Sequence, residues 1–177
     1  MKTIPLTQGQ VALVDDADYE WLSAFKWYAH KRDNGDFYAI QRIRNPPDKE
    51  VQIRMHRMIL YGVPEVDHWN HNTLDNQRGN LRAATKSQNQ ANSRRHEDNR
   101  SGFKGVTWRK DAGKWVARII ASRRQIHLGF FTGIADAARA YDKAARENFG
   151  EFACLNLPEK ATDEPNRPAK AAPDKTL

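Results

Sequence analysis

Cysteine is almost absent from this chain of 177 residues, which contains only Cys154. Disulfide frameworks and zinc sites built on cysteine are therefore excluded. No apolar stretch approaches the roughly 20 residues that span a bilayer, and the N-terminus lacks the apolar segment of a signal peptide. These absences predict a soluble, intracellular protein.

Acidic residues are outnumbered by basic ones, but only in part of the chain. Lys and Arg number 7 against 8 Asp and Glu over residues 1–50, but 8 against 5 over 51–100 and 10 against 5 over 101–157. The sequence pI is near 9.6. Positive charge concentrated in this way favours a polyanionic partner, nucleic acid before a membrane.

Aromatic residues are missing from the end of the chain. The segment after Leu157 contains four Pro and no periodic pattern, which predicts a disordered tail over residues 159–177. The chain as a whole is 39% hydrophobic and has five Trp, enough to build cores elsewhere. It shows no internal repeat.

Residues 1–50 read as a small α+β region. Short apolar runs predict strands at 3–6, 11–14 and 37–40, and Asp33-Asn34-Gly35-Asp36 predicts a hairpin turn before the last of them. Residues 15–23 predict a short helix that buries Tyr19, Trp21 and Leu22. Pro46-Pro47-Asp48 marks a loop.

Residues 51–93 contain most of the side chains suited to catalysis. Asp67 directly precedes His68, and Thr85 with Gln88 forms a capping box that predicts a helix over 86–93. Asn89 then lies one turn into that helix. Carboxylate and amide oxygens suit Mg²⁺, and a neutral imidazole can take a proton from water. The pattern predicts a phosphodiester hydrolase with a metal site beside a general base.

These motifs resemble the HNH endonucleases of the ββα-metal class, in particular the homing enzymes of phages and group I introns. The resemblance rests on Asp67-His68-Trp69-Asn70, Leu74-Asp75-Asn76, Asn80-Leu81-Arg82 and Asn89. It implies that Asp67 and Asn89 bind one divalent ion, Mg²⁺ or Mn²⁺. It also implies that His68 is the general base and that Asn80 holds the loop carrying it.

Two features stay outside this assignment. His56 matches a recurring upstream position of the family, but its role is left open, and His71 receives no role. A zinc site on His56, His68 and His71 is disfavoured, because the sequence offers no partner Cys and no helical His-x₃-His spacing.

Residues 94–101 read as a polar linker, and 102–158 as a second patterned unit. Three alternating runs between 103 and 131 predict strands with one apolar and one basic face. A helix follows, capped by Thr132 or Gly133 and ended by Gly150. The basic face suits the major groove of B-DNA, where Arg and Gln read base edges.

This unit resembles the APETALA2/ethylene-response-factor type of DNA-binding domain. The motifs are Phe103-Lys104-Gly105-Val106, Gly113 to Ile119, His127 to Phe131, Ala137 to Ala145 and Leu155 to Pro158. The expected DNA contacts are Lys104, Thr107, Arg109, Lys114, Arg118, Arg123, Arg124, Gln125 and His127. Thr107, Ile120 and Gln125 stand where plant members have Arg, and His127 stands where they have Trp. The resemblance therefore implies the fold, a three-stranded antiparallel sheet packed on one helix, but no target sequence.

Together, these observations predict an α+β protein with a β-rich N-terminal region (1–50), a nuclease unit (51–93), a linker (94–101) and a DNA-binding domain (102–158). The predicted function is that of a monomeric, metal-dependent HNH endonuclease of a phage or mobile element, acting on double-stranded DNA in the cytoplasm. A DNA-binding transcriptional regulator with an inactive nuclease unit is the alternative. A protein-interaction module has little support.

Overall fold

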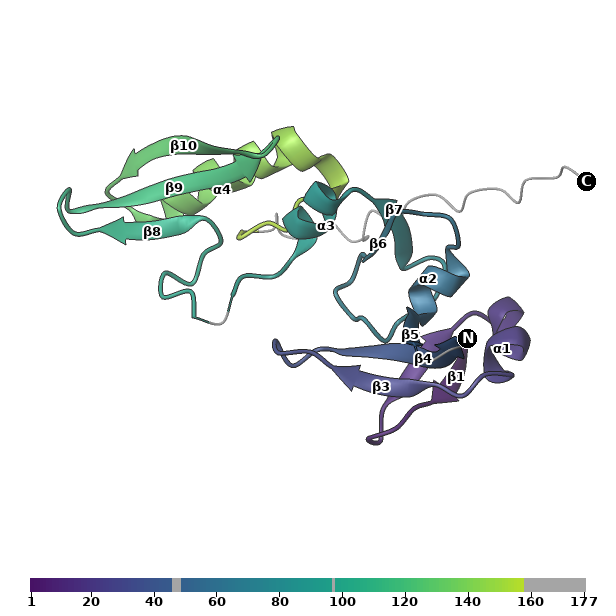
Figure 1. Ribbon diagram of the computed structural model, residues 1–177. Coiled ribbons are helices and arrows are strands. Elements are labelled where there is room, and N and C mark those ends of the chain that lie inside the picture. The colour runs from purple at the N-terminus through teal and green to yellow at the C-terminus, as the bar shows by residue number, and fades with distance from the viewer. Residues whose placement is uncertain (46–48, 97, 158–177) are drawn as a thin grey trace, which may run out of the picture. The chain divides into compact units, whose positions relative to one another are not determined.

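The structure is a computed structural model that describes residues 1–45, 49–96 and 98–157, in two compact units, residues 1–83 and 84–157. The fold is α+β, with helices and small sheets in both units (Figure 1). The predicted loop at 46–48, the tail at 159–177 and residue 97 of the predicted linker lie outside the described residues. No helix of the described ranges is long and apolar enough to cross a membrane.

The first unit contains three small sheets with two short helices. Strands β1 and β2 pair antiparallel, β3, β4 and β5 form an antiparallel sheet in that order, and β6 pairs with β7. The elements in chain order are β1 (Lys2–Pro5), β2 (Val11–Val14), α1 (Asp16–Ser23), β3 (Tyr28–Lys31), β4 (Phe37–Asn45), β5 (Lys49–Arg54), α2 (Met55–Ile59), β6 (Glu65–His68) and β7 (Leu81–Ala84).

The expected strands near 3–6, 11–14 and 37–40 and the helix near 15–23 are all present. The hairpin turn is confirmed by the hydrogen bond from the Arg32 backbone N to the Asp36 carbonyl, at 2.8 Å. Strands β3 and β5 and helix α2 were not predicted. The two strands are short or largely polar, so their pairing with β4 rather than their own pattern stabilises them, whereas α2 is held by burial of Met55, His56 and Ile59.

One hydrophobic core joins residues 1–50 to the segment that follows. Its fully or largely buried members come from both parts of the unit: Ile4, Ala12, Val14, Leu22, Trp27, Ala39, Met55, Ile59, Val66 and Leu81. Trp21, predicted to be buried, is 37% exposed, while Asp18 is only 3% exposed. Asp18 takes that position because Arg78 donates two hydrogen bonds to its carboxylate, at 2.7 and 2.8 Å.

The second unit is a short helix followed by a three-stranded sheet and a long helix. The antiparallel sheet has the order β10-β9-β8, and α4 covers one of its faces (Figure 1). The elements are α3 (Lys86–Asn92), β8 (Val106–Arg109), β9 (Lys114–Ala121), β10 (Arg124–Phe131), α4 (Ile134–Phe149) and the 3₁₀ turn η1 (Gly150–Phe152).

The packing between α4 and the sheet follows the predicted stripe. Ala138, Tyr141 and Ala145 are buried, and Phe149 is partly buried against the same cluster. Gly133 caps the start of α4 and Gly150 its end. Small Ala side chains let the helix approach the sheet closely, so this stripe belongs to the core.

The opposite face of the sheet is less regular than the alternation predicted. The β9–β10 register shifts between His127 and Gly129, which marks a bulge. The bulge brings the rings of His127 and Phe130 to 4.9 Å of each other on this face. Val116, opposite Thr107 and Phe130 in the ladder, is completely buried. The face therefore carries basic side chains such as Arg118 beside exposed apolar ones such as Phe130.

Candidate functional site

The proposed catalytic pair lies at the end of β6. Asp67 and His68 are 4% and 5% exposed. Strand β7 pairs with β6 and carries Arg82, whose Nε donates a hydrogen bond of 2.8 Å to Asp67 Oδ2. The buried carboxylate thus has a guanidinium beside it, which offsets part of the cost of burying its charge.

Asn76 determines which nitrogen of His68 carries the proton. Its side-chain Nδ2 donates to the Leu74 carbonyl at 3.2 Å, which turns Oδ1 toward His68 Nε2 at 3.3 Å. An amide oxygen can only accept, so in the neutral ring Nε2 carries the hydrogen and Nδ1 is the basic nitrogen. Asn76 is 1% exposed, so this partner is itself held in the interior.

The charge state of His68 follows from its surroundings. Burial lowers the pKa of His68, and the hydrogen bond to Asn76 and the charges of Asp67 and Asp75 oppose that shift. At neutral pH the ring is therefore uncharged. A neutral imidazole is the form that can accept a proton from water.

Asn80 holds together the two ends of the loop that follows His68. Its side-chain Oδ1 accepts from the Asn70 backbone N at 2.9 Å, and its Nδ2 donates to the Asp75 carbonyl at 2.7 Å. Its carbonyl also accepts from the Trp69 backbone N at 2.9 Å. These bonds fix the first residues after His68 and so restrict the position of the imidazole.

The N-terminal region anchors the same loop. Leu13 of β2 exchanges backbone hydrogen bonds with Leu74 and Asn76, both at 2.8 Å. Asp15 accepts from the Arg78 backbone N at 2.8 Å. Residues 1–50, which carry little visible chemistry in the sequence, thus support the loop that contains Asn76.

His56 lies directly against His68. The two ring centroids are 4.9 Å apart with an interplanar angle of 89°, and Tyr38 stacks edge-on against both rings at 5.5 and 6.1 Å. Burial, together with the neighbouring charges of His68, Arg54 and Arg57, lowers the pKa of His56 to about 2. The neutral His56 ring therefore packs against the His68 ring.

Asn89, the second predicted metal ligand, lies on α3 of the second unit and is partly buried. The predicted capping box at the start of α3 is present: Gln88 N donates to Thr85 Oγ1 at 3.2 Å, and Thr85 N donates to Gln88 Oε1 at 2.8 Å. No group of three or more His, Cys, Asp or Glu that could hold a metal ion occurs in residues 1–45, 49–96 and 98–157. One carboxylate and one amide are nevertheless the oxygen donors that suit Mg²⁺, which keeps most of its waters.

Three residues near the pair were not assigned from the sequence: Asn76, Arg82 and His56. Asn76 and Arg82 lie inside motifs that the sequence shows, Leu74-Asp75-Asn76 and Asn80-Leu81-Arg82. Their roles depend on partners eight and fifteen positions away, respectively. Only the folded chain brings those partners together.

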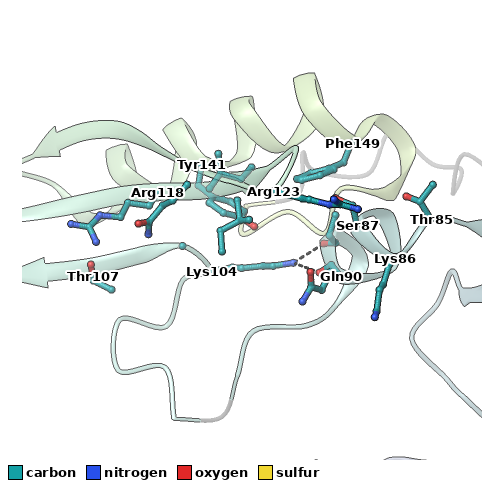
Figure 2. A pocket seen from close by; sticks show the side chains of 15 residues that line it. Thr85, Lys86, Ser87, Gln90, Lys104, Thr107, Arg118, Arg123, Tyr141 and Phe149 are labelled. Carbon is teal, nitrogen blue, oxygen red and sulfur yellow. Dashed lines mark hydrogen bonds between the residues drawn. The ribbon is translucent and has the colours of Figure 1, made fainter. Parts of the chain in front are cut away.

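Most of the expected DNA contacts lie on the second unit with their side chains accessible. Thr107, Lys114, Arg123, Arg124, Gln125 and His127 are exposed, and Arg118 is partly exposed. Arg109 is engaged locally, because its Nε donates to Asp111 at 2.7 Å. Lys104 differs from the others, since its ammonium is directed at backbone carbonyls of α3 (Figure 2).

A pocket of about 720 Å³ lies between α3 and the sheet within this unit (Figure 2). Its lining includes the cationic side chains of Lys86, Arg118 and Arg123. None of these three forms an ion pair within the described part of the chain. Their charge is therefore available to an anionic partner.

Comparison with known proteins finds relatives for both the HNH segment and the predicted DNA-binding domain. Residues 60–91 match the HNH endonuclease family. An uncharacterized HNH endonuclease of Acanthamoeba polyphaga mimivirus is 27% identical over 153 residues, which cover 84% of this chain and 76% of the viral protein. Dehydration-responsive element-binding protein 2D of Arabidopsis thaliana is 43% identical over 75 residues. Both resemblances are confirmed.

The plant relatives match only part of this chain. The match to the element-binding protein covers 40% of this chain and 34% of that protein. An AP2-like ethylene-responsive transcription factor of the same plant is 34% identical over 94 residues, 44% of this chain and 17% of that protein. The chain therefore spans about a third or less of these relatives. The HNH match (60–91) runs across the division at 83/84 into α3.

Proposed function

We propose that this protein is a metal-dependent DNA endonuclease whose second unit binds duplex DNA. The observation that carries the proposal is the buried His68, whose Nε2 is committed to Asn76 while Asp67 lies next to it in the chain. Both belong to the segment that matches the HNH endonuclease family. The homology to AP2-type proteins and the accessible basic side chains support DNA binding.

In the proposed reaction, Nδ1 of neutral His68 takes a proton from the attacking water. Asn76 and Asn80 hold the imidazole and its loop in place, so little reorganisation is needed when the proton moves. Asp67 and Asn89 are the residues that would hold a divalent ion, as HNH nucleases generally use one. When bound, such an ion offsets negative charge on the phosphate and on the leaving oxygen.

The proposal also covers the identity of the ion and the type of enzyme. We propose Mg²⁺ or Mn²⁺ as the ion, because both accept carboxylate and amide oxygens. We also propose that the protein is a phage or mobile-element enzyme of the homing type and that it acts as a monomer. The similarity to a viral HNH endonuclease agrees with a viral or mobile-element origin.

The direct test is cleavage of supercoiled plasmid and phage DNA by the full chain with Mg²⁺, with Mn²⁺ and with a chelator. Nicked or linear products are expected with metal and none with chelator. His68→Ala should lower the rate by ~10²–10⁴-fold, since a general base contributes that much. Its DNA affinity should stay within about twofold, because a general base adds little to ground-state binding.

His30→Ala is the matched control, since His30 is exposed on β3. It should cleave at the wild-type rate. Wild-type cleavage by His68→Ala, or cleavage that resists chelation, would refute the assignment.

The ligand assignment has its own test. Asp67→Asn keeps an oxygen that Arg82 can bond but removes the ligand charge, so the Mg²⁺ concentration for half-maximal cleavage should rise at least about tenfold. Asn89→Asp should keep activity with Mn²⁺, because an oxygen ligand remains. Metal titrations that neither substitution changes would remove both residues from the metal site.

A DNA-binding regulator with an inactive nuclease unit is the second candidate. The ion pair between Asp67 and Arg82 favours it, because a bound ion must share that carboxylate with a guanidinium. Metal-dependent plasmid cleavage that His68→Ala abolishes would exclude this candidate. Specific DNA binding without any cleavage would establish it.

A further inference from the structure

Helix α3, which carries Asn89, is anchored inside the second unit by one partly buried cation, Lys104. Lys104 Nζ donates hydrogen bonds to the carbonyls of Ala91 at 2.6 Å and Gln90 at 3.4 Å (Figure 2). It also donates to the Ser93 carbonyl at 2.8 Å. The last carbonyls of a helix have no partner within the helix, and the C-terminal end of its dipole attracts positive charge. Lys104 thus adds a positive charge at the C-terminal end of α3, whose own last turn has no basic residue and where Ser93 already donates to the Gln90 carbonyl.

The Lys104 side chain is only partly exposed to solvent. Burial lowers the pKa of the Lys104 ammonium. In the described ranges of the chain no carboxylate lies within ion-pair distance of it. The carbonyls of α3 therefore compensate for its desolvation, and removing them from Lys104 would leave a partly buried charge without comparable partners.

The backbone of Lys104 is fixed to the rest of the unit. Asn156 accepts from the Lys104 N at 2.6 Å and donates to its carbonyl at 3.0 Å. Asn156 is held in turn by Asp142 of α4, which is 2% exposed and accepts from the Asn156 N at 2.8 Å. The Cys154 N also donates to the Ala91 carbonyl at 3.3 Å. A continuous set of hydrogen bonds thus joins α4 to the end of α3.

We propose that Lys104 is a positioning residue for the nuclease reaction: it fixes α3, and with it Asn89, to the unit that binds DNA. Asn89, the proposed metal ligand, then keeps a fixed position relative to the DNA-binding sheet of the same unit. This inference rests on the proposed function. It assigns the Lys104 ammonium to the carbonyls at the end of α3, in place of the direct DNA contact that the sequence predicts for it.

The test compares Lys104→Met with Lys114→Met in the full chain. Lys114 is exposed on β9 and matches the charge and size of Lys104. Hydrogen exchange at the α3 amides should accelerate about tenfold or more in Lys104→Met and stay unchanged in Lys114→Met. Exchange at β9 should stay unchanged in both variants, which shows that the unit remains folded.

Cleavage provides the second readout. Lys104→Met should raise the Mg²⁺ concentration for half-maximal cleavage at least about fivefold, while Lys114→Met should only weaken DNA binding. Lys104→Arg should restore much of the wild-type behaviour, because it keeps a charged donor near the same carbonyls.

Each outcome of these experiments supports or overturns the role proposed for Lys104. Unchanged α3 exchange in Lys104→Met would overturn the anchoring role. Accelerated exchange with an unchanged metal requirement would show that Lys104 holds α3 but would overturn its role in positioning the metal ligand. If the wild-type chain does not cleave, the proposed function and the coupling both fail, while exchange at α3 still reports whether Lys104 holds the helix.

Discussion

Asn76, eight positions further along the chain, determines which ring nitrogen of His68 is basic. Asn76 accepts from Nε2, so the neutral ring presents Nδ1, and burial keeps the ring neutral at ordinary pH. His56 and Tyr38 close the space around the same ring. At the scale of single residues, the candidate site therefore consists of one proposed general base, His68, and several groups that restrict its position.

Asn76→Ala should lower the cleavage rate by about 10- to 100-fold, because misplacing a catalytic group costs that much. The acid limb of the pH–rate profile should move to lower pH, since the Asn76 hydrogen bond raises the pKa of His68. Both effects are read from pH–rate profiles of the two proteins. Asn72→Ala, an exposed change in the same loop, should alter the rate less than about threefold. An acid limb that does not move would mean that Asn76 leaves His68 untouched.

His56 makes folding sensitive to acid. In the folded chain its pKa falls to about 2, whereas the unfolded value is near 6.5, so the unfolded state binds more protons between these limits. His56 therefore costs no stability above about pH 6.5. Below that pH it lowers the free energy of unfolding by up to about 1.4 kcal/mol per pH unit.

His56→Phe should remove this part of the acid sensitivity while keeping a ring against His68. Urea unfolding at pH 7.5 and pH 5 measures it: the wild-type protein should lose about 1–2 kcal/mol more than the variant on acidification. Equal losses in both proteins would show that His56 is not held neutral.

The elements differ in what stabilises them. Helix α4 has a strong apolar stripe, two glycine caps and a sheet face to cover. Helix α3 is short and largely polar, and a side chain from another element closes its end. The sheet depends on a close approach at Gly105, where φ is +72° and a Cβ would overlap the Tyr141 ring and the Arg118 carbonyl.

Gly105→Ala should destabilise the second unit by about 3 kcal/mol or more, because a left-handed backbone and a clash with core and backbone atoms coincide. Gly113→Ala is the control, with φ of +58° but nothing within 4 Å of the new Cβ. It should cost only about 1–2 kcal/mol. Thermal unfolding of the three proteins measures the difference. An equal loss of stability in the two variants would show that Gly105 makes no tight contact.

The whole molecule combines two units whose division falls at 83/84, inside the HNH match. The first unit carries Asp67 and His68, and the second carries Asn89 and the basic sheet. Residues 101–157 also hold twice as many basic as acidic residues, ten against five. Affinity for DNA should therefore depend mainly on the second unit.

Arg118 and Arg123 should contribute to that affinity in different ways. Arg118 is partly exposed on β9 opposite His127, so Arg118→Ala should relax sequence preference at a cost of ~1–3 kcal/mol. Arg123 is exposed in the β9–β10 turn, so Arg123→Ala should weaken binding to all duplexes alike and lower the salt slope by about one. Salt-titrated binding to a selected and a random duplex separates the two. Identical effects on both duplexes would show that Arg118 reads no base.

Local pattern determined much of this protein. The spacing of apolar residues and glycines predicted α4 and the three strands before it, and Thr85 with Gln88 predicted the start of α3. The motif residues of the HNH segment were found in the same way, because nearby residues in the chain suffice to define a cap, a turn or a motif. The catalytic and metal roles given to those residues remain predictions.

Tertiary structure decided what those residues touch. The hydrogen bond between Asn76 and His68, the burial of His56 beside them, and the contact of Lys104 with α3 all depend on long-range packing. The bulge after His127 likewise depends on how β10 pairs with β9. A single chain shows which polar groups are present, but only folding determines which of them lose water and which partners they gain in exchange.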